Sequence, residues 1–302
     1  MIREIRELKL DASSRQELSE DKKPLFPCAV YTGEVHSFVS QQIPLHWHPD
    51  LEMCMLDQGS IRVTLTSGVH VLHPGEGYFV NSNIMHGVNY NESGPCRYRS
   101  IVFDPSILSG APGSAFDALY VRPFLERGPA SFILSGEEWK PAMQAFERNW
   151  AACRDERDGY EFESRAALSE IFMEMKRHSG DTACSRPAHL QEMRMQAIIT
   201  WIDGHYGDQV RLSDMAGILH ISPRECQRLF ADTLRCTPMQ YLLQRRISAA
   251  SAKLAEGNET ITEISYQCGF ESLSYFTNQF GKVMGISPRR YRERIQLSAA
   301  KK

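Results

Sequence analysis

The sequence predicts an α+β fold of two domains, in which an all-β unit and a pair of helices precede an all-α domain. Three observations predict this class. Strand-like alternation occupies the first third of the chain, apolar residues at helical spacing follow it, and the last third contains a helix-turn-helix pattern twice. A length of 302 residues is also sufficient for two domains.

The composition divides the chain into five segments. In the first, a polar arm, Ile2, Ile5 and Leu8 have the spacing of one amphipathic helical turn. The predicted segments are the arm at 1–23, a β-barrel at 24–110, a helical packing or dimerisation segment at 111–178, a linker at 179–189, and a double helix-turn-helix domain at 190–297.

The charge distribution separates the two halves of the chain. The net charge of −3 includes 15 Lys and Arg against 11 Asp and Glu from Leu190 onward, so this part carries +4 and the rest −7. Such an asymmetry is typical of a DNA-binding region attached to one that does not touch DNA.

Other bulk features indicate the compartment. The N-terminus is charged, so we expect no signal peptide, and no apolar run reaches the length of a membrane span. The eight cysteines include no C-x-x-C pair, as in a reduced cytosolic chain. We therefore predict a cytoplasmic protein with no membrane contact.

Alternation and turn residues predict the strands of the β unit. Ile61, Val63 and Leu65 alternate with polar residues, and Gly68 allows a turn after them. Further strands are predicted at 69–72 and at 78–80, on either side of the turn at Pro74 and Gly75.

Two apolar stripes predict a helix pair after the β unit, because their members recur at helical spacing. The stripes are Trp139, Met143, Phe146 and Trp150, and Leu168, Ile171, Phe172 and Met175. Such stripes must be buried, and two partners are open. One is the β unit itself, and the other is a second copy of the chain, in a homodimer contact between Glu137 and His178.

A degenerate repeat with an offset of 50 residues occupies the C-terminal third. The matching positions are Ser222 and Ser272, Phe230 and Phe280, Thr237–Pro238 and Ser287–Pro288, and Tyr241 and Tyr291. Each copy has the pattern of a short helix, a tight turn and a longer helix, which predicts two helix-turn-helix units.

In the first unit, Val210 to Leu219 is the predicted supporting helix, with Ser213 as its cap, and His220 occupies a turn that favours positive φ. Ser222 caps the second helix, which runs to about Leu234. Its predicted inward residues are Cys226, Leu229, Phe230 and Leu234, and its outward residues are Arg224, Gln227, Arg228 and Ala231. Arg and Gln are side chains that read guanine and adenine in the major groove.

The second unit begins with a capping box at Thr260 and Glu263, has Gly269 in its turn, and caps its second helix with Ser272. The predicted inward residues are Phe276, Phe280 and Val283, and the outward residues are Leu273, Ser274, Thr277 and Asn278. Leu273 is suited to contact a thymine methyl group, and Asn278 is suited to read an adenine.

A long helix from Thr237–Pro238 to Gly257 connects the units. If it is rigid, the two outward faces would enter successive major-groove segments, about 34 Å apart. A helical bundle without a DNA role would explain one such unit, but two related units with Arg, Gln and Asn facing outward favour binding to double-stranded DNA.

The residues from Leu212 to Tyr291 resemble the DNA-binding domain of the AraC/XylS family of bacterial transcription regulators. The resemblance lies in Ile264, Gly269–Phe270, Ser272, Tyr275–Phe276, Phe280, Gly285, Ser287–Pro288 and Tyr291–Arg292, with Arg246 and Ala250 in the connecting helix. It implies that the outward residues contact base edges, that Ser222 and Ser272 lie near phosphates, and that Arg292 belongs to the DNA-binding set. Two residues depart from the family pattern: Asn278 replaces a basic residue, and Cys226 replaces a larger aliphatic one.

A second motif lies in the β unit. His46 and His48 point to one face of a strand, Glu52 follows on that face if Pro49 keeps the register, and His86 returns after another strand. Three imidazoles and a carboxylate suit a divalent metal such as Zn, Ni, Fe or Mn. The pattern at His46, His48 and Glu52 resembles the first motif of the cupin barrel, and Pro74–Gly75 and His86 are a partial match to its second. The resemblance implies that these three residues and His86 hold the positions that metal-binding cupins use.

The same four residues have two other interpretations, because they would also line an effector pocket or be purely structural. In AraC-type regulators the barrel usually holds an effector. Trp47, Met53 and Tyr78 are expected to be wall or core residues.

The preferred hypothesis is a regulator without catalytic residues, whose barrel binds a small-molecule effector such as a sugar. By resemblance it would be an activator, with RNA polymerase as a partner. Two alternatives remain open: a metal-dependent cupin enzyme, either a dioxygenase or an isomerase, and a regulator for which the metal is the effector. A metabolic enzyme would not need two helix-turn-helix units.

Overall fold

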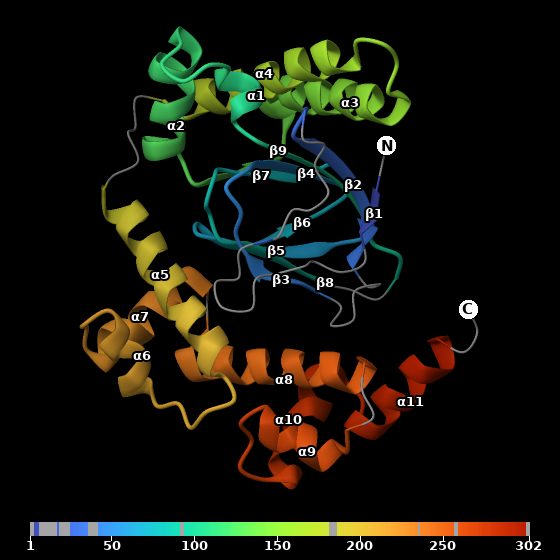
Figure 1. Cartoon of the computed structure of the whole chain (residues 1–302), viewed down its shortest axis with the longest axis vertical. Helices are drawn as coiled ribbons and strands as arrows, with labels where there is room; N and C mark the ends of the chain where they lie inside the picture. The colour runs from blue at the N-terminus through green and yellow to red at the C-terminus, as the bar shows by residue number, and fades with distance from the viewer. Residues whose placement is uncertain are drawn as a thin grey trace. The chain divides into compact units, whose positions relative to one another are not determined.

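The computed structural model describes residues 3–5, 17, 25–35, 42–90, 94–180, 186–234, 236–256 and 259–299 (Figure 1). The chain divides into two compact units between Glu192 and Met193, within helix α5 (Arg186–His205). The predicted α+β class with two domains is confirmed. Among the described residues, no helix is both long and apolar enough to cross a membrane.

The N-terminal unit, up to Glu192, contains two β-sheets. The larger sheet has six strands in the order β1 (Arg3–Ile5), β2 (Cys28–Glu34), β9 (Arg97–Phe103), β4 (Leu51–Gln58), β7 (Gly77–Val80) and β10 (Ser131–Leu134). The smaller has four strands in the order β3 (Gln42–His46), β8 (His86–Tyr90), β5 (Ile61–Leu65) and β6 (Gly68–Leu72). The strands expected from the alternation at 61–65, 69–72 and 78–80 are therefore present.

Apolar side chains from both sheets share a buried core, so the sheets face each other. This core includes Ile43, Val63 and Val88 from the smaller sheet and Leu56 and Val80 from the larger one. The predicted cupin-like β-barrel is therefore present as two facing sheets, and no ladder joins the two sheets among the described residues.

The N-terminal arm contributes a strand. β1 pairs in parallel with β2, with Ile5 opposite Gly33, so the helical turn predicted at Ile5 is wrong. The free edge of β2 offers backbone donors and acceptors, and these favour the extended conformation. Ile2 and Leu8 lie outside the described residues.

A helical layer covers the outer face of the larger sheet (Figure 1). It consists of α1 (Ser106–Ser109), the π-helical turn η2 (Asp117–Val121), α2 (Arg122–Arg127), the 3₁₀ turn η3 (Glu137–Trp139), α3 (Lys140–Asp155) and α4 (Tyr160–His178). The two apolar stripes of α3 and α4 pack with Met53, Ile101 and Phe103 of the sheet in one core. The structure therefore shows that these stripes pack against the β unit, which is one of the two partners considered for them.

The C-terminal unit, from Met193 onward, is all-α and contains both predicted helix-turn-helix units. The helices after α5 are α6 (Leu212–Ile218), α7 (Pro223–Leu234), α8 (Pro238–Glu256), α9 (Ile261–Gln267), α10 (Leu273–Met284) and α11 (Pro288–Ala299). The first unit is α6 and α7, the second is α9 and α10, and α8 connects them.

The local signals for these helices are mostly confirmed. His220 has φ 52° and Gly269 has φ 78°, as both turns require. The Ser222 and Ser272 hydroxyls accept hydrogen bonds from the third residue of their helices, at 3.2 Å in each case. The capping box of Thr260 and Glu263 is also present.

Two local predictions are wrong. Ser213 does not cap α6, which begins at Leu212; instead the Asp214 carboxylate accepts a hydrogen bond from the Arg211 backbone N–H at 2.8 Å. Val283 is 48% exposed, and Met284 packs against the core in its place. A shift of one residue turns a helical side chain by about 100°, so the approximate stripe missed the inward position.

Arg246 of α8 cross-links the two helix-turn-helix units. Its Nε donates to the Tyr206 carbonyl at 2.8 Å and its Nη2 to the Asp208 carbonyl at 2.7 Å, both in the segment that leads into α6. The same guanidinium lies 5.9 Å from the ring centre of Phe270, in the turn of the second unit. The contacts of this one side chain therefore restrict how the units move about α8.

Replacing Gly269 with alanine should destabilise the C-terminal unit by at least about 1–2 kcal/mol, the cost of a left-handed conformation for a residue with a Cβ. A Cβ there would also lie 2.6 Å from the Tyr206 carbonyl oxygen and 2.8 Å from Arg246 Nη2. Urea unfolding measures the change. Gly281→Ala is the control, because that helical position has open space around it; equal stability of both variants would contradict the prediction.

Candidate metal site and nucleic-acid interface

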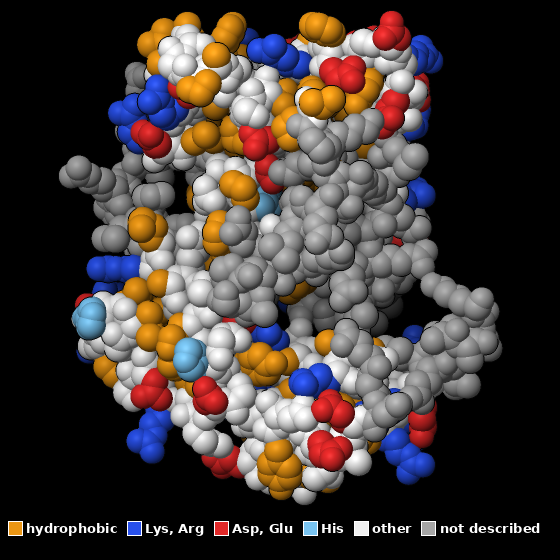
Figure 2. Space-filling view, viewed as in Figure 1, with side chains coloured by type: hydrophobic (Ala, Val, Ile, Leu, Met, Phe, Trp, Pro, Cys, Tyr) orange, Lys and Arg blue, Asp and Glu red, His pale blue; other side chains and the backbone are white. Residues whose placement is uncertain are grey.

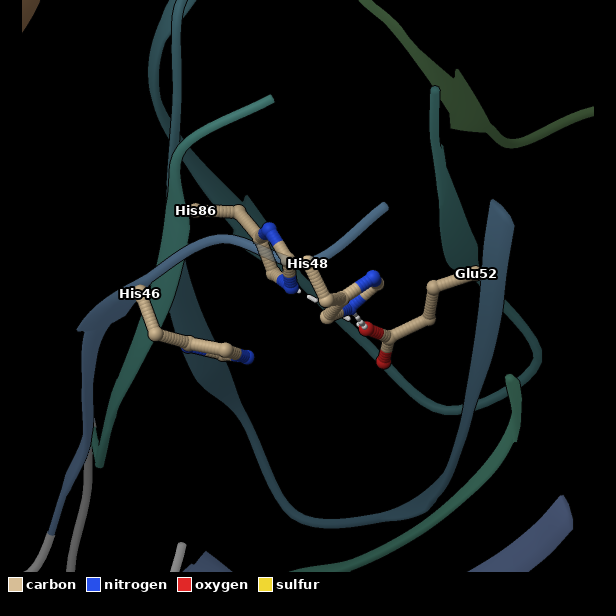
Figure 3. Close-up of side chains that lie close together, drawn as sticks. All are labelled: His46, His48, Glu52 and His86. Atoms are coloured by element: carbon tan, nitrogen blue, oxygen red, sulfur yellow. Dashed lines mark hydrogen bonds and ion pairs between the residues drawn. The ribbon is translucent and has the colours of Figure 1, made fainter. Parts of the chain in front are cut away.

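Four buried side chains converge between the two sheets of the N-terminal unit (Figure 3). His46 ends β3, His48 follows it, His86 begins β8, and Glu52 comes from β4 of the opposite sheet. One possible ligand atom from each of the four lies within 4.8 Å of all the others. The structure therefore brings together the residues that the sequence motif predicted.

The route of Glu52 into this cluster differs from the prediction. The chain bends at Pro49 and Asp50, so β3 and β4 are separate strands in different sheets. Glu52 does not follow His46 and His48 along one strand face; its carboxylate approaches the imidazoles from the other side of the core.

Backbone carbonyls orient all three imidazoles. The Nδ1 atoms of His46, His48 and His86 lie 2.9, 3.2 and 2.9 Å from the carbonyl oxygens of Pro44, Asp50 and Ile84. A carbonyl oxygen can only accept, so each Nδ1 carries the donated proton. The Nε2 atom of a neutral imidazole is then an acceptor, and this is the arrangement that holds histidine ligands in metal sites.

Glu52 makes contacts that require a cation. Its Oε2 lies 3.2 Å from His48 Nε2 and 3.0 Å from His86 Nε2, and all of these atoms are acceptors when both imidazoles are neutral. A proton or a metal ion must therefore lie between them. The other oxygen, Oε1, accepts hydrogen bonds from the Ser100 hydroxyl at 2.7 Å and the Tyr78 hydroxyl at 3.4 Å.

Burial and the neighbouring side chains shift the pKa values of Glu52 and His48 in opposite directions. Burial raises the pKa of the Glu52 carboxyl, but hydrogen bonds from His48 and His86 outweigh it and hold the pKa well below its ordinary value. Burial lowers the pKa of His48, but Glu52 and other carboxylates raise it above its ordinary value. Burial and the neighbouring His86 and His48 keep the pKa of His46 well below its ordinary value. His46 is therefore neutral at pH 7, and available as a ligand.

Sequence reasoning missed three members of this site. Ser100 and Tyr78 anchor Glu52 across strands, and Tyr78 was expected to be only a wall or core residue. Glu17, from the segment before β2, places Oε2 at 3.7 Å from His46 Nε2 and 4.0 Å from His48 Nε2. No motif marks any of the three, because each reaches the site through tertiary packing.

The cavity at the cluster is small. It has a volume of about 30 Å³ and is lined by Tyr31, Tyr78 and Tyr98 in addition to the ionisable residues. Such a volume accommodates an ion and one or two water molecules, since one water needs roughly 10–15 Å³. Pockets for organic ligands are roughly 300–1,000 Å³, so a sugar would require the sheets to move apart.

In the C-terminal unit, nine of the ten predicted DNA-binding residues are exposed. They are Ser222, Arg224, Gln227, Arg228, Ser272, Leu273, Ser274, Thr277 and Asn278. The inward residues Cys226, Leu229 and Phe230 of α7 and Phe276 and Phe280 of α10 are buried. Basic and acidic side chains are interspersed over this unit on the face shown in Figure 2. The candidate DNA-binding surface is therefore identified by the exposed side chains of α7 and α10 and not by net charge.

The remaining predicted residue, Arg292, has a different environment. It is only partly exposed, and its Nη2 donates to the Glu259 carbonyl at 2.7 Å, which ties α11 to the start of α9. This contact favours a packing role. A feature that sequence reasoning missed is a capping box in the first unit, where the Glu225 carboxylate accepts from the Ser222 backbone N–H at 2.9 Å.

The fold and two family matches define the class of protein as a DNA-binding regulator with a ligand-binding domain. Residues 32–197 match the family profile described as AraC-like ligand binding domain, and residues 215–294 match one described as helix-turn-helix domain. The first match alone spans more than half of the chain. The chain therefore belongs to the AraC family of transcriptional regulators, and is not an enzyme.

Similar proteins include the uncharacterized HTH-type transcriptional regulator YdeC of Bacillus subtilis (strain 168), 26% identical over 282 residues, which are 92% of this chain and 96% of the relative. The HTH-type transcriptional activator RhaS of Pectobacterium carotovorum subsp. carotovorum (strain PC1) is 23% identical, covering 82% of this chain and 87% of the relative. A crystal structure of ToxT from Vibrio cholerae with unsaturated fatty acid bound has a TM-score of 0.44 and 14% identity, covering 88% of this chain and 94% of that one.

Proposed function

We propose that this chain is a metal-responsive transcription regulator, in which a divalent transition-metal ion at His46, His48, Glu52 and His86 is the effector. The observation that carries the proposal is the opposition of two imidazole Nε2 atoms and the Glu52 carboxylate at 3.0–3.2 Å. Three nitrogen donors and one oxygen donor suit Zn, Ni, Fe or Mn. When bound, the ion would replace a proton and neutralise the carboxylate.

A sugar effector is the second candidate, favoured by the tyrosine hydroxyls that line the same cavity. The cavity volume of about 30 Å³ argues against it, because a sugar would have to separate buried strands. A metal ion requires no such movement. The two effectors are separable, since a chelator removes one and not the other.

We propose that α7 and α10 read DNA through their outward residues. Arg224, Gln227 and Arg228 would contact base edges from α7, and Leu273, Thr277 and Asn278 from α10, with Ser274 beside them. The helix N-termini that begin at Ser222 and Ser272 would face phosphates. Arg292 would support α11 instead of touching DNA.

A homodimer through the outward faces of α3 and α4 is a further part of the proposal. A groove of about 420 Å³ lies between these helices, lined by Ala151, Ala152, Ala166 and Ala167 together with charged side chains. Phe162 of α4 is 80% exposed, and apolar side chains are visible over the helical layer in Figure 2. As an activator, which is what the RhaS relative is called, the dimer would contact RNA polymerase in the cytoplasm.

The metal content of the protein tests the proposed effector. Protein dialysed against a chelator and then against Zn, Ni, Fe(II) or Mn should bind one ion per chain, measured by elemental analysis. A gel shift with the DNA upstream of its own gene should then differ between the chelated and reconstituted protein. Substoichiometric metal under every condition would contradict the proposal, and an effect of sugars on chelated protein would favour the alternative.

A further inference from the structure

We propose that Glu17 is a fifth protein ligand of the metal site, so that the bound ion links Glu17 to the two sheets. This inference rests on the proposed function and deepens it, because it specifies a residue outside the His46, His48, Glu52 and His86 motif.

The carboxylates of Glu52 and Glu17 lie nearest to different imidazoles of the site. Glu52 Oε2 contacts His48 and His86, whereas Glu17 Oε2 lies nearest to His46, at 3.7 Å, and 4.0 Å from His48. Ligands of one ion are separated by about 3–4 Å, because each metal–ligand bond is about 2.1 Å long. Glu17 is therefore at the separation expected for a ligand bound to the same ion as His46.

The main chain holds Glu17 beside the histidines. Its backbone N–H donates to the carbonyl of Trp47 at 2.9 Å, and Trp47 lies between His46 and His48 in the sequence. This hydrogen bond ties the backbone of Glu17 to the stretch of backbone that carries two of the imidazoles.

The charges in the cavity call for a divalent cation. The Glu17 side chain is 10% exposed and the Glu52 side chain 9%, so two carboxylates are withdrawn from water close together. Among the described residues that line the cavity, none is Lys or Arg. Buried charges are costly unless they are paired, and a divalent ion would neutralise both carboxylates while the imidazoles remain uncharged.

The donor set also bears on which metal binds. Three imidazole nitrogens and two carboxylates make five donors, which exceeds the tetrahedral set typical of structural zinc. Ions that accept five or six ligands, such as Mn, Fe(II) or Ni, fit this set better. Wild-type protein should therefore bind Mn or Ni with all five residues.

Isothermal titration of chelator-treated protein with MnCl₂ or NiCl₂ tests this assignment. Glu17→Gln should weaken metal affinity by at least about 10-fold, the lower end of the effect of removing even an indirect metal contact. The control Glu137→Gln should leave affinity unchanged, because that side chain is 84% exposed and lies in η3. Without metal, Glu17→Gln should unfold at the same temperature as wild type or higher, since glutamine has nearly the same size and carries no buried charge.

Limited trypsin digestion provides the second readout. Saturating metal should slow cleavage after Arg15 and Lys22 in wild type and in Glu137→Gln, but not in Glu17→Gln. Equal metal affinity and equal protection in Glu17→Gln and wild type would overturn the role of Glu17 and leave the proposed effector intact. Failure of wild type to bind either metal would instead contradict the proposed function itself.

Discussion

Replacing Glu52 with glutamine should lower the metal affinity of the N-terminal unit by more than about 100-fold. Removing a residue that only hydrogen-bonds to a metal ligand already lowers metal affinity by about 10- to 100-fold, and Glu52 would be a ligand itself. Glu52 is the side chain that brings opposite charge to both His48 and His86, at 3.2 and 3.0 Å. The glutamine oxygen can still accept from Ser100, and its amide can donate to an imidazole Nε2. The variant should therefore fold, with the glutamine amide N–H between the two side chains where the wild-type site would hold a proton or a metal ion.

Isothermal titration with Ni or Mn measures this loss, and thermal unfolding of the metal-free protein checks the fold. The metal-free Glu52→Gln variant should melt no lower than wild type. Added metal should raise the melting temperature of wild type and of Glu137→Gln, but not that of Glu52→Gln. Glu137→Gln again serves as the control for removing one carboxylate. Metal affinity within a few-fold of wild type in Glu52→Gln would mean that the four side chains do not form a metal site.

Replacing Arg228 with alanine should weaken operator binding by about 1–3 kcal/mol, as expected for the loss of a paired contact to a base edge. Arg228 is exposed on α7, on the side opposite the buried Cys226 and Phe230. Its removal should leave the stability of the unit nearly unchanged, because exposed side chains contribute little to packing. The effect should therefore appear in DNA affinity and not in folding.

A gel shift and a footprint on the DNA upstream of its own gene measure this change. Arg127→Ala is the matched control, since it removes an exposed arginine from the last turn of α2 in the other unit. The control should alter operator affinity little. An unchanged footprint and affinity in Arg228→Ala would contradict the orientation assigned to α7.

Local sequence signals were sufficient for most of the C-terminal unit. Cap residues such as Ser222 and Ser272 act on the nearest backbone groups, and the turn residues His220 and Gly269 act through their own φ angles. These interactions span a few residues, so a single sequence displays them. The misplacement of Val283 shows the limit, because the helical stripe fixes a face only to within about one residue.

The N-terminal site was only partly predictable, because its parts meet through tertiary structure. The histidine and glutamate motif identified four members, but it placed Glu52 on the wrong element. Glu17, Ser100 and Tyr78 reach the same point from other segments, and strand pairing between β4 and β9 places Ser100 beside Glu52. Alternation identifies a strand and its buried face, but it does not specify which strands become neighbours.

Metal binding at the N-terminal site and DNA binding at α7 and α10 should be linked, and linkage is reciprocal. The direct measurement is the dissociation constant of the metal, determined by titration with and without saturating operator DNA. DNA should change this constant by the same factor by which metal changes the affinity for DNA. A metal dissociation constant that is identical in the two titrations would contradict this linkage.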